Sequence, residues 1–212
     1  LHPRVRRQRQ MCIRDRYLLF LNNDVEIITE SWLEEMLQLC QQKDVGMAGA
    51  KLYYPDDTIQ HAGVVVGLGG VAAHVLCKLP RDAEGYMGRL RCVQEISAVT
   101  AACMMVKTSV FKAVGGFDEE LKVAFNDIDL CMKVRKYGVK IVFTPYAELY
   151  HYESKSRGME DTPEKQLRFS REVNCFRRKW ERELLKGDPY YNPNLTLNNT
   201  DCSLRKQEKN GD

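Results

Sequence analysis

Hydrophobic residues along this chain form short continuous runs that alternate with stripes at helical spacing, a pattern typical of α/β proteins. Continuous apolar runs predict strands buried on both faces at residues 17–21, 45–54 and 140–145. Apolar positions three or four residues apart predict helices over residues 33–40, 127–137 and 163–180. We therefore expect a mixed sheet with flanking helices.

The helix predicted after residue 126 carries two carboxylates, Asp127 and Asp129, at its start. Ile128 and Val134 belong to its buried stripe, and Gly138 provides the stop. Acidic residues at the start of a helix are favoured by the helix dipole, so two capping carboxylates are the simplest interpretation. The polar residues that end neighbouring strands favour a second interpretation, developed below.

Two further stretches differ from regular elements. Gln60–Leu90 is rich in glycine and contains His61 and His74, which predicts a loop-rich insert with a short β-hairpin. The run from Val93 to Val106 predicts one long strand with small residues at its centre. Those small residues allow either the close approach of a ligand or close packing of the sheet on a helix, and both remain open at this stage.

The composition of 44% hydrophobic and 29% charged residues over 212 positions is ordinary for one soluble domain. The formal charge of +3 comes from residues 1–16, which hold six Arg and one Asp; the remainder holds 26 basic and 28 acidic residues. The domain itself therefore has no basic surplus that favours nucleic acid. We expect residues 1–16 to be a non-native or disordered basic tail, and a basic arm that binds RNA or anionic lipid is the alternative.

The eight cysteines include no C-x-x-C pair, which argues against a zinc ribbon or a thioredoxin-type site. Unpaired thiols at this density favour a reducing compartment, so we expect a cytoplasmic protein. No apolar run reaches the roughly 18 residues of a membrane span. Peripheral association with the inner face of the membrane remains an open alternative.

Polar residues that could bind a metal ion or act as a general base follow the ends of the predicted strands. Asn22 and Asp24 end the first strand, and His151 follows the last one. Oxygen and imidazole ligands of this kind suit a divalent cation, and a carboxylate such as Asp127 suits a general base. The same residues lie within four segments that occur in order along the chain: LNND, GGFDEE, FNDIDLCMKVRKYG and TPYAELYH.

Taken together, these segments resemble the family 2 inverting glycosyltransferases of the GT-A fold. The resemblance runs from about residue 17 to residue 197. The segments HYESKSRG and DPYYNPNLTL resemble a subgroup found in the assembly of O-antigen and other cell-surface polysaccharides. The family's nucleotide-binding half is not recognised here, so we expect the C-terminal part of a GT-A (Rossmann-like) domain that is truncated at its N-terminus. The expected organisation is a tail at 1–16, a partial domain at 17–185 and a partly disordered extension at 186–212.

The resemblance implies a metal site. Asp24 matches the acidic residue that binds Mg²⁺ or Mn²⁺ bridging the donor diphosphate, and His151 matches a histidine that completes this site. Asn22 replaces the first acid of the Asp-x-Asp motif, and its amide can hydrogen-bond the ribose or the sugar.

The resemblance also implies a general base, Asp127, preceded by Asn126 where the family has Glu. Asn126 and Asp129 are included among the predicted donor- or substrate-binding residues. Asp129 lies about 200° around the helix from Asp127, so it should point toward a cap or a supporting contact. Lys155 and Arg157 are placed to meet phosphate, with solvated loop charges as the equal alternative.

The function implied is transfer of a hexosyl group from a nucleotide-sugar donor to a glycan or lipid-linked acceptor, with inversion and with a metal ion. A non-catalytic interaction module of the same fold, or an inactive fragment, is the rival hypothesis. A third class, nucleic-acid binding through the arginine-rich tail, would show strongly salt-dependent retention on DNA.

Overall fold

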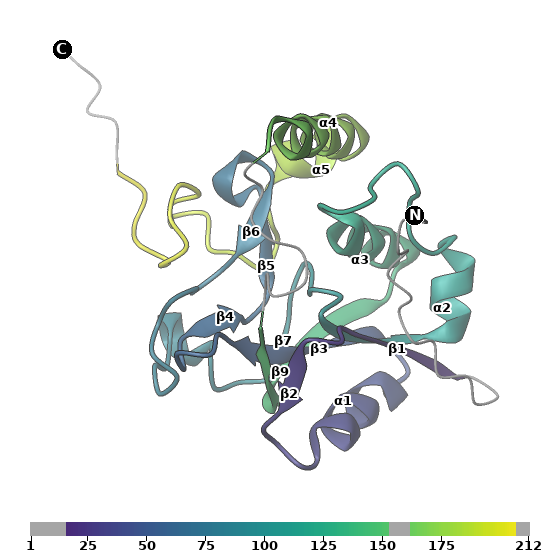
Figure 1. The fold of residues 1–212 in the computed structure, drawn as a ribbon, viewed down its shortest axis with the longest axis vertical. Coiled ribbons are helices and arrows are strands. Elements are labelled where there is room, and N and C mark those ends of the chain that lie inside the picture. The colour runs from purple at the N-terminus through teal and green to yellow at the C-terminus, as the bar shows by residue number, and fades with distance from the viewer. Residues whose placement is uncertain (1–15, 153–161, 207–212) are drawn as a thin grey trace.

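The structure is a computed structural model that describes residues 16–152 and 162–206 (Figure 1). The predictions for residues 1–15 and for the last six positions lie outside the described residues. In chain order the elements are β1 (Tyr17–Leu21), β2 (Val25–Ile27), α1 (Trp32–Gln41), β3 (Val45–Tyr53), β4 (Ile59–His61), β5 (Val64–Val66), η1 (Leu68–Gly70), β6 (Ala72–His74), η2 (Tyr86–Gly88), β7 (Gln94–Glu95), β8 (Cys103–Lys107), α2 (Thr108–Ala113), α3 (Asn126–Tyr137), β9 (Lys140–His151), α4 (Pro163–Lys179) and α5 (Glu181–Lys186).

A seven-stranded mixed sheet organises the fold, with the order β1-β8-β3-β9-β2, β4 joined to β3 and β7 joined to β9. Strand β8 is antiparallel to both β1 and β3, and β3 is parallel to β9. Strands β1, β3 and β9 therefore run in the same direction, and their carboxyl ends meet at one edge of the sheet. The predicted mixed α/β architecture is confirmed.

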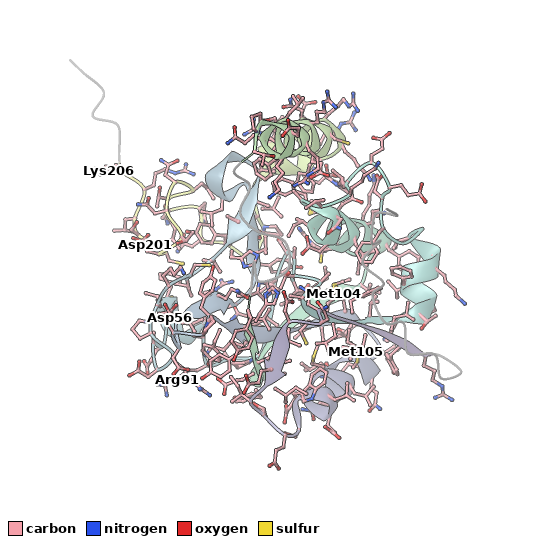
Figure 2. All side chains as sticks on the ribbon, viewed as in Figure 1. Asp56, Arg91, Met104, Met105, Asp201 and Lys206 are labelled. Carbon is pink, nitrogen blue, oxygen red and sulfur yellow. The ribbon has the colours of Figure 1, made fainter. Side chains whose placement is uncertain are left out.

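The two faces of the sheet bury separate cores (Figure 1). Helix α1 covers one face, where Met36 and Cys40 pack, and α2 and α3 cover the other. Successive side chains of a strand alternate between faces, so Met104 belongs to the α3 core and Met105 to the α1 core (Figure 2). Burial on both faces explains why the strands are continuous apolar runs in the sequence.

The prediction of one strand from Val93 to Val106 is wrong. The chain forms β7, leaves the sheet and re-enters it as β8. Between them Val99 crosses β3 so closely that a Cβ added to Gly49 would lie 2.3 Å from Val99 Cγ1. The room for this close approach comes from Gly49 of β3, and the small residues at the centre of the predicted strand form a tight turn at Thr100–Ala102, called the 100–102 turn below.

Strand β9 is longer than the predicted strand because it continues through Pro145 to His151. Its register against β3 shifts between Gly49 and Lys51, whose partners are Phe143 and Glu148. Pro145 lies in this irregularity, where the missing N–H of proline does not interrupt the hydrogen-bond ladder. The irregularity lets one strand run from the sheet centre to the edge where His151 lies.

The predicted insert contains the expected hairpin, formed by β5 and β6. The segment that follows α5 packs against it: Val66 N–H donates to Asp188 Oδ2 at 2.8 Å, and Leu76 N–H donates to the carbonyl of Thr200. Figure 1 shows the hairpin standing between the sheet and α4. Across the described ranges, no helix has both the length and the apolar character needed to cross a membrane.

Strand β1 lies at the end of the sheet and, within the described residues, pairs only with β8. Its sequence is entirely apolar and aromatic, and an unpaired edge of this kind is prone to associate with another strand. We expect the isolated chain to dimerise or aggregate through β1. Light scattering should show species larger than the monomer; a monodisperse wild-type monomer would contradict this prediction.

Candidate active site

Asp24 and His151 lie together at the edge where the parallel strands end. Asp24 Oδ1 is 3.3 Å from His151 Nε2, and these side chains are only 11% and 12% exposed. Asn22 Nδ2 is 3.0 Å from the same imidazole nitrogen. The structure therefore brings together Asn22 and Asp24, predicted at the end of the first strand, and His151, the histidine predicted to complete the metal site.

This proximity does not come from adjacency of the strands that carry Asp24 and His151, although the carboxyl ends of adjacent strands would also meet in one crevice. Strands β1 and β9 are separated by β8 and β3. After Asp24 the chain enters β2, which pairs with the end of β9, so that Val25 lies opposite His151. Tyr152 N–H also donates to the Asp24 carbonyl at 2.8 Å. The short strand β2 is therefore what joins Asp24 to His151.

Gln60, a residue not singled out by the sequence, orients His151. Its Oε1 is 2.7 Å from His151 Nδ1, and its Nε2 donates to the His151 carbonyl at 3.1 Å. Because the His151 carbonyl can only accept, the Gln60 atom that contacts it must be the amide nitrogen. The other end of the Gln60 amide is therefore Oε1, which accepts from the imidazole Nδ1–H. In the neutral imidazole, Nε2 is then the unprotonated nitrogen. A hydrogen bond of this type to the other ring nitrogen is typical of metal-ligating histidines.

This arrangement suits a divalent cation. In the neutral tautomer the lone pair of His151 Nε2 can accept from Asn22 Nδ2 at 3.0 Å, and an Asp24 carboxylate oxygen lies 3.3 Å from the same nitrogen. Carboxylate and imidazole are both ligand types that Mn²⁺ accepts, whereas Mg²⁺ favours oxygen alone. The described residues contain no cluster of three or more acidic, histidine or cysteine ligands. An ion here would therefore take its other ligands from a bound substrate and from water.

Asp127 is half-buried in the first turn of α3. Its Oδ2 accepts from Ala101 N–H at 3.2 Å, and its Oδ1 accepts from Ile128 N–H at 2.9 Å. Asn126 Oδ1 accepts from the Asp127 N–H at 2.7 Å. Asn126 thus supports the backbone of the first turn, and the Asp127 carboxylate is oriented by two backbone donors.

The 100–102 turn connects Asp127 with the pair formed by Asp24 and His151. Ala101 N–H reaches Asp127, and the carbonyl of the next residue, Ala102, accepts from Asn22 N–H at 3.0 Å. Asn22 in turn contacts His151 through its side chain. Three elements that are distant in the sequence therefore share one short turn.

Asp129 occupies a different environment from Asp127. It is fully buried, and its Oδ1 accepts from Trp180 Nε1 at 2.8 Å and lies 2.8 Å from Lys179 Nζ. Its Oδ2 lies 3.2 Å from Lys133 Nζ. This environment favours a role in joining α3 to the end of α4, rather than contact with a donor or substrate. The expectation that Asp129 points away from Asp127 agrees with these contacts.

A second buried carboxylate, Glu172 of α4, holds the segment that leads into α3. Its Oε1 accepts from the N–H groups of Lys122 and Val123, both at 3.1 Å, and its Oε2 accepts from Ala124 N–H at 2.9 Å. Phe125 then adopts a left-handed conformation, with φ of 62°, immediately before the helix. Glu172 of α4 therefore holds the segment from which α3, with Asp127 in its first turn, begins. The two predicted phosphate-contacting residues, Lys155 and Arg157, lie outside the described residues.

Comparison with known proteins connects this geometry to a family. A family model described as a glycosyltransferase-like family matches residues 9–172. The chain belongs to this glycosyltransferase family. Its relationship to the family 2-like enzymes, expected from the ordered segments, is thereby confirmed.

Two relatives of this glycosyltransferase chain match most of its length. The "Uncharacterized protein y4gI" of Sinorhizobium fredii is 56% identical over 192 residues, which are 90% of this chain and 21% of the relative. The "O-antigen biosynthesis protein RfbC" of Myxococcus xanthus is 40% identical over 196 residues, which are 92% of this chain and 15% of the relative. The glycosyltransferase chain thus spans about a fifth or less of the length of each.

A solved structure supports the fold of the glycosyltransferase chain. The crystal structure of GalNAc-T7 with UDP, GalNAc and Mn²⁺ superposes with a TM-score of 0.55 at 13% sequence identity, covering 80% of this chain and 32% of that one. At this identity the likeness concerns the fold alone, and it confirms the predicted GT-A architecture.

Proposed function

We propose that this chain carries the catalytic residues of an inverting, metal-dependent glycosyltransferase that moves a sugar from a nucleotide-sugar donor to a glycan or lipid-linked acceptor. The observation that carries the proposal is the pairing of Asp24 with His151, whose tautomer is set by Gln60. The 100–102 turn connects this pair to Asp127. The 40% identity to a protein named for O-antigen biosynthesis supports an acceptor in cell-surface polysaccharide assembly.

The proposed roles follow from what the reaction requires. A leaving nucleoside diphosphate develops negative charge, which Mg²⁺ or Mn²⁺ held by Asp24 and His151 would neutralise. The GalNAc-T7 structure was solved with UDP and Mn²⁺, which is consistent with the use of a divalent ion. Asn22, which contacts the same imidazole nitrogen, is placed to hydrogen-bond the donor beside that ion.

Asp127 is the proposed general base, which accepts the proton of the acceptor hydroxyl as that oxygen attacks the anomeric carbon. Its two backbone hydrogen bonds orient the carboxylate before any substrate arrives. A double displacement would need a second carboxylate close to the anomeric carbon. Asp129, the neighbouring carboxylate on α3, is fully buried by Trp180 and two lysines, which favours single displacement with inversion.

The setting of this reaction is also a proposal. The seven cysteines among the described residues are all free thiols, in keeping with a reducing cytoplasm. An acceptor carried on a lipid would place the enzyme at the inner face of the membrane by peripheral association.

Replacing Asp24 by alanine should weaken metal-dependent binding of the donor nucleotide, because it removes the carboxylate ligand of the proposed ion. Calorimetric titration of the complete protein with UDP, GDP and dTDP, each with and without Mn²⁺, measures this effect. We expect the Mn²⁺-dependent affinity to fall by about tenfold or more, since even the loss of a residue that supports a metal ligand costs 10–100-fold.

The neighbouring exposed residue supplies the control, because Asn23→Ala removes a polar side chain from the same turn without touching the proposed ligands. Equal losses in the two variants would argue against the metal assignment. Absence of nucleotide binding by the complete wild-type protein would instead favour the non-catalytic interaction module.

A further inference from the structure

His61, at the end of β4, is a fully buried imidazole that the proposed reaction does not use. Its Nε2 accepts from Thr100 N–H at 3.4 Å, in the 100–102 turn. Its Nδ1 lies 3.4 Å from His74 Nδ1, and the two rings meet edge to face with centroids 4.8 Å apart. The ring therefore fills the space between the insert hairpin and the turn that contacts Asp127.

The protonation of His61 follows from its partner. A backbone N–H can only donate, so Nε2 accepts from Thr100 and the proton of the neutral ring lies on Nδ1, beside a His74 Nδ1 that also lies 3.0 Å from the Gln60 carbonyl. Burial, together with the neighbouring His74 and His151, holds the pKa of His61 well below its ordinary value. The ring is therefore neutral at pH 7, and it presents a fixed acceptor to the turn.

The contacts of the turn alternate along the chain. Thr100 N–H donates to His61, Ala101 N–H donates to Asp127 Oδ2, and the Ala102 carbonyl accepts from Asn22. The two N–H groups belong to successive peptide units that are separated only by the two backbone dihedrals of Thr100, whose hydroxyl accepts from Ala102 N–H at 3.3 Å within the turn. A turn without its His61 contact would keep its internal bond and the bond to Asn22, but the Thr100 N–H would lose its partner, and the Ala101 N–H could rotate away from the carboxylate.

We propose that His61 is a positioning residue of this enzyme: as a hydrogen-bond acceptor it sets the 100–102 turn so that Ala101 N–H orients the Asp127 carboxylate. This inference rests on the proposed function for its catalytic consequence, whereas its geometric part concerns this chain alone. It also gives the insert a role in catalysis, since β4 and the hairpin that follows it hold His61 in place.

Two polar variants separate the acceptor from the bulk of the ring. In His61→Gln the side-chain amide reaches the position of Nε2 and can still accept from Thr100, whereas in His61→Asn the amide ends at the position of Nδ1. Both variants are uncharged, and both remove the aromatic ring. We expect turnover of the complete enzyme to stay within about threefold of wild type for His61→Gln and to fall about 10–100-fold for His61→Asn, with the donor KM unchanged, since a catalytic group misplaced by about 1 Å loses up to 10² in rate.

A second measurement needs no enzymatic activity. In the chain labelled with ¹⁵N-alanine, the amide signal of Ala101, assigned from its absence in Ala101→Gly, should move when Asp127→Asn replaces the charged acceptor by a neutral one. At constant pH the wild-type position of the signal should be kept in His61→Gln and lost in His61→Asn. This signal reports the hydrogen bond directly, so it decides the inference even if no donor is turned over.

The outcomes are distinct. Equal turnover and equal Ala101 amide positions in the His61→Gln and His61→Asn variants would overturn the positioning role. A complete wild-type protein that is inactive with every nucleotide sugar, while the Ala101 signal responds to the variants as described, would count against the proposed function and leave the role of His61 in the geometry supported.

Discussion

Replacing Asp127 by asparagine should lower turnover by about 10²–10⁴-fold, the usual range for the loss of a general base, while donor binding is retained. The asparagine side chain keeps the size of the carboxylate and can still accept one backbone hydrogen bond, so the fold and the 100–102 turn should be preserved. It cannot take the proton of the acceptor hydroxyl. Release of nucleoside diphosphate by the complete enzyme, followed with a panel of UDP-, GDP- and dTDP-sugars, measures turnover, and calorimetry with the nucleotide and Mn²⁺ measures binding.

Asp44→Asn provides a control with the same change in charge. Asp44 is an exposed carboxylate that precedes β3, so it lies at the end of the sheet opposite the site, and it pairs with Lys140 on the surface. Turnover of this variant should match that of wild type. If Asp127→Asn keeps turnover within a few-fold of wild type, or loses nucleotide binding as well, Asp127 is not the base.

Replacing Asp129 by alanine should destabilise the domain by about 3 kcal/mol, because it leaves two lysines and the indole N–H of Trp180 without their shared carboxylate. The estimate is at the lower end for a broken buried ion pair, since Lys133 and Lys179 remain 19% and 32% exposed. In a domain of this size the melting temperature should fall by about 6–12 °C. Thermal and denaturant unfolding followed by circular dichroism check this value.

Asp44→Ala again serves as the comparison, since it breaks an ion pair whose side chains are both largely exposed and should change stability little. Below the melting temperature Asp129→Ala should bind donor nucleotide as wild type does. A variant with unchanged stability and weakened donor binding would restore the substrate-binding role that the sequence suggested for Asp129.

Much of the framework follows from the sequence because it depends on local periodicity. Continuous apolar runs identify β1 and β3, and the stripe through Ile128 and Val134 with Gly138 as the stop identifies α3. Burial on both faces of the sheet makes the strands uniformly apolar, and one-sided burial gives the helix its period. The family could be recognised for a related reason, since its polar segments end or begin these elements in a constant order.

The site is less accessible to such reasoning. Asp24, Asp127 and His151 are suggested by their places at element ends, but nothing local shows that β2 pairs with β9 and thereby joins Asp24 to His151. Gln60 and His61 belong to an otherwise apolar stretch of the insert, and no short-range pattern connects them to residues some 90 and 40 positions away. Two polar residues in an apolar strand were the only signal for them in the sequence.

The sequence by itself therefore determined the α/β class, the main strands and helices, and the residue types available for metal binding and base catalysis, because each depends on neighbours within a few positions. The tertiary structure alone decided which of these residues meet. It broke the predicted strand at the 100–102 turn, where Gly49 leaves room for Val99, placed Asp127 against that turn, and buried Asp129 against Trp180. These outcomes depend on contacts between distant segments, which local periodicity does not encode.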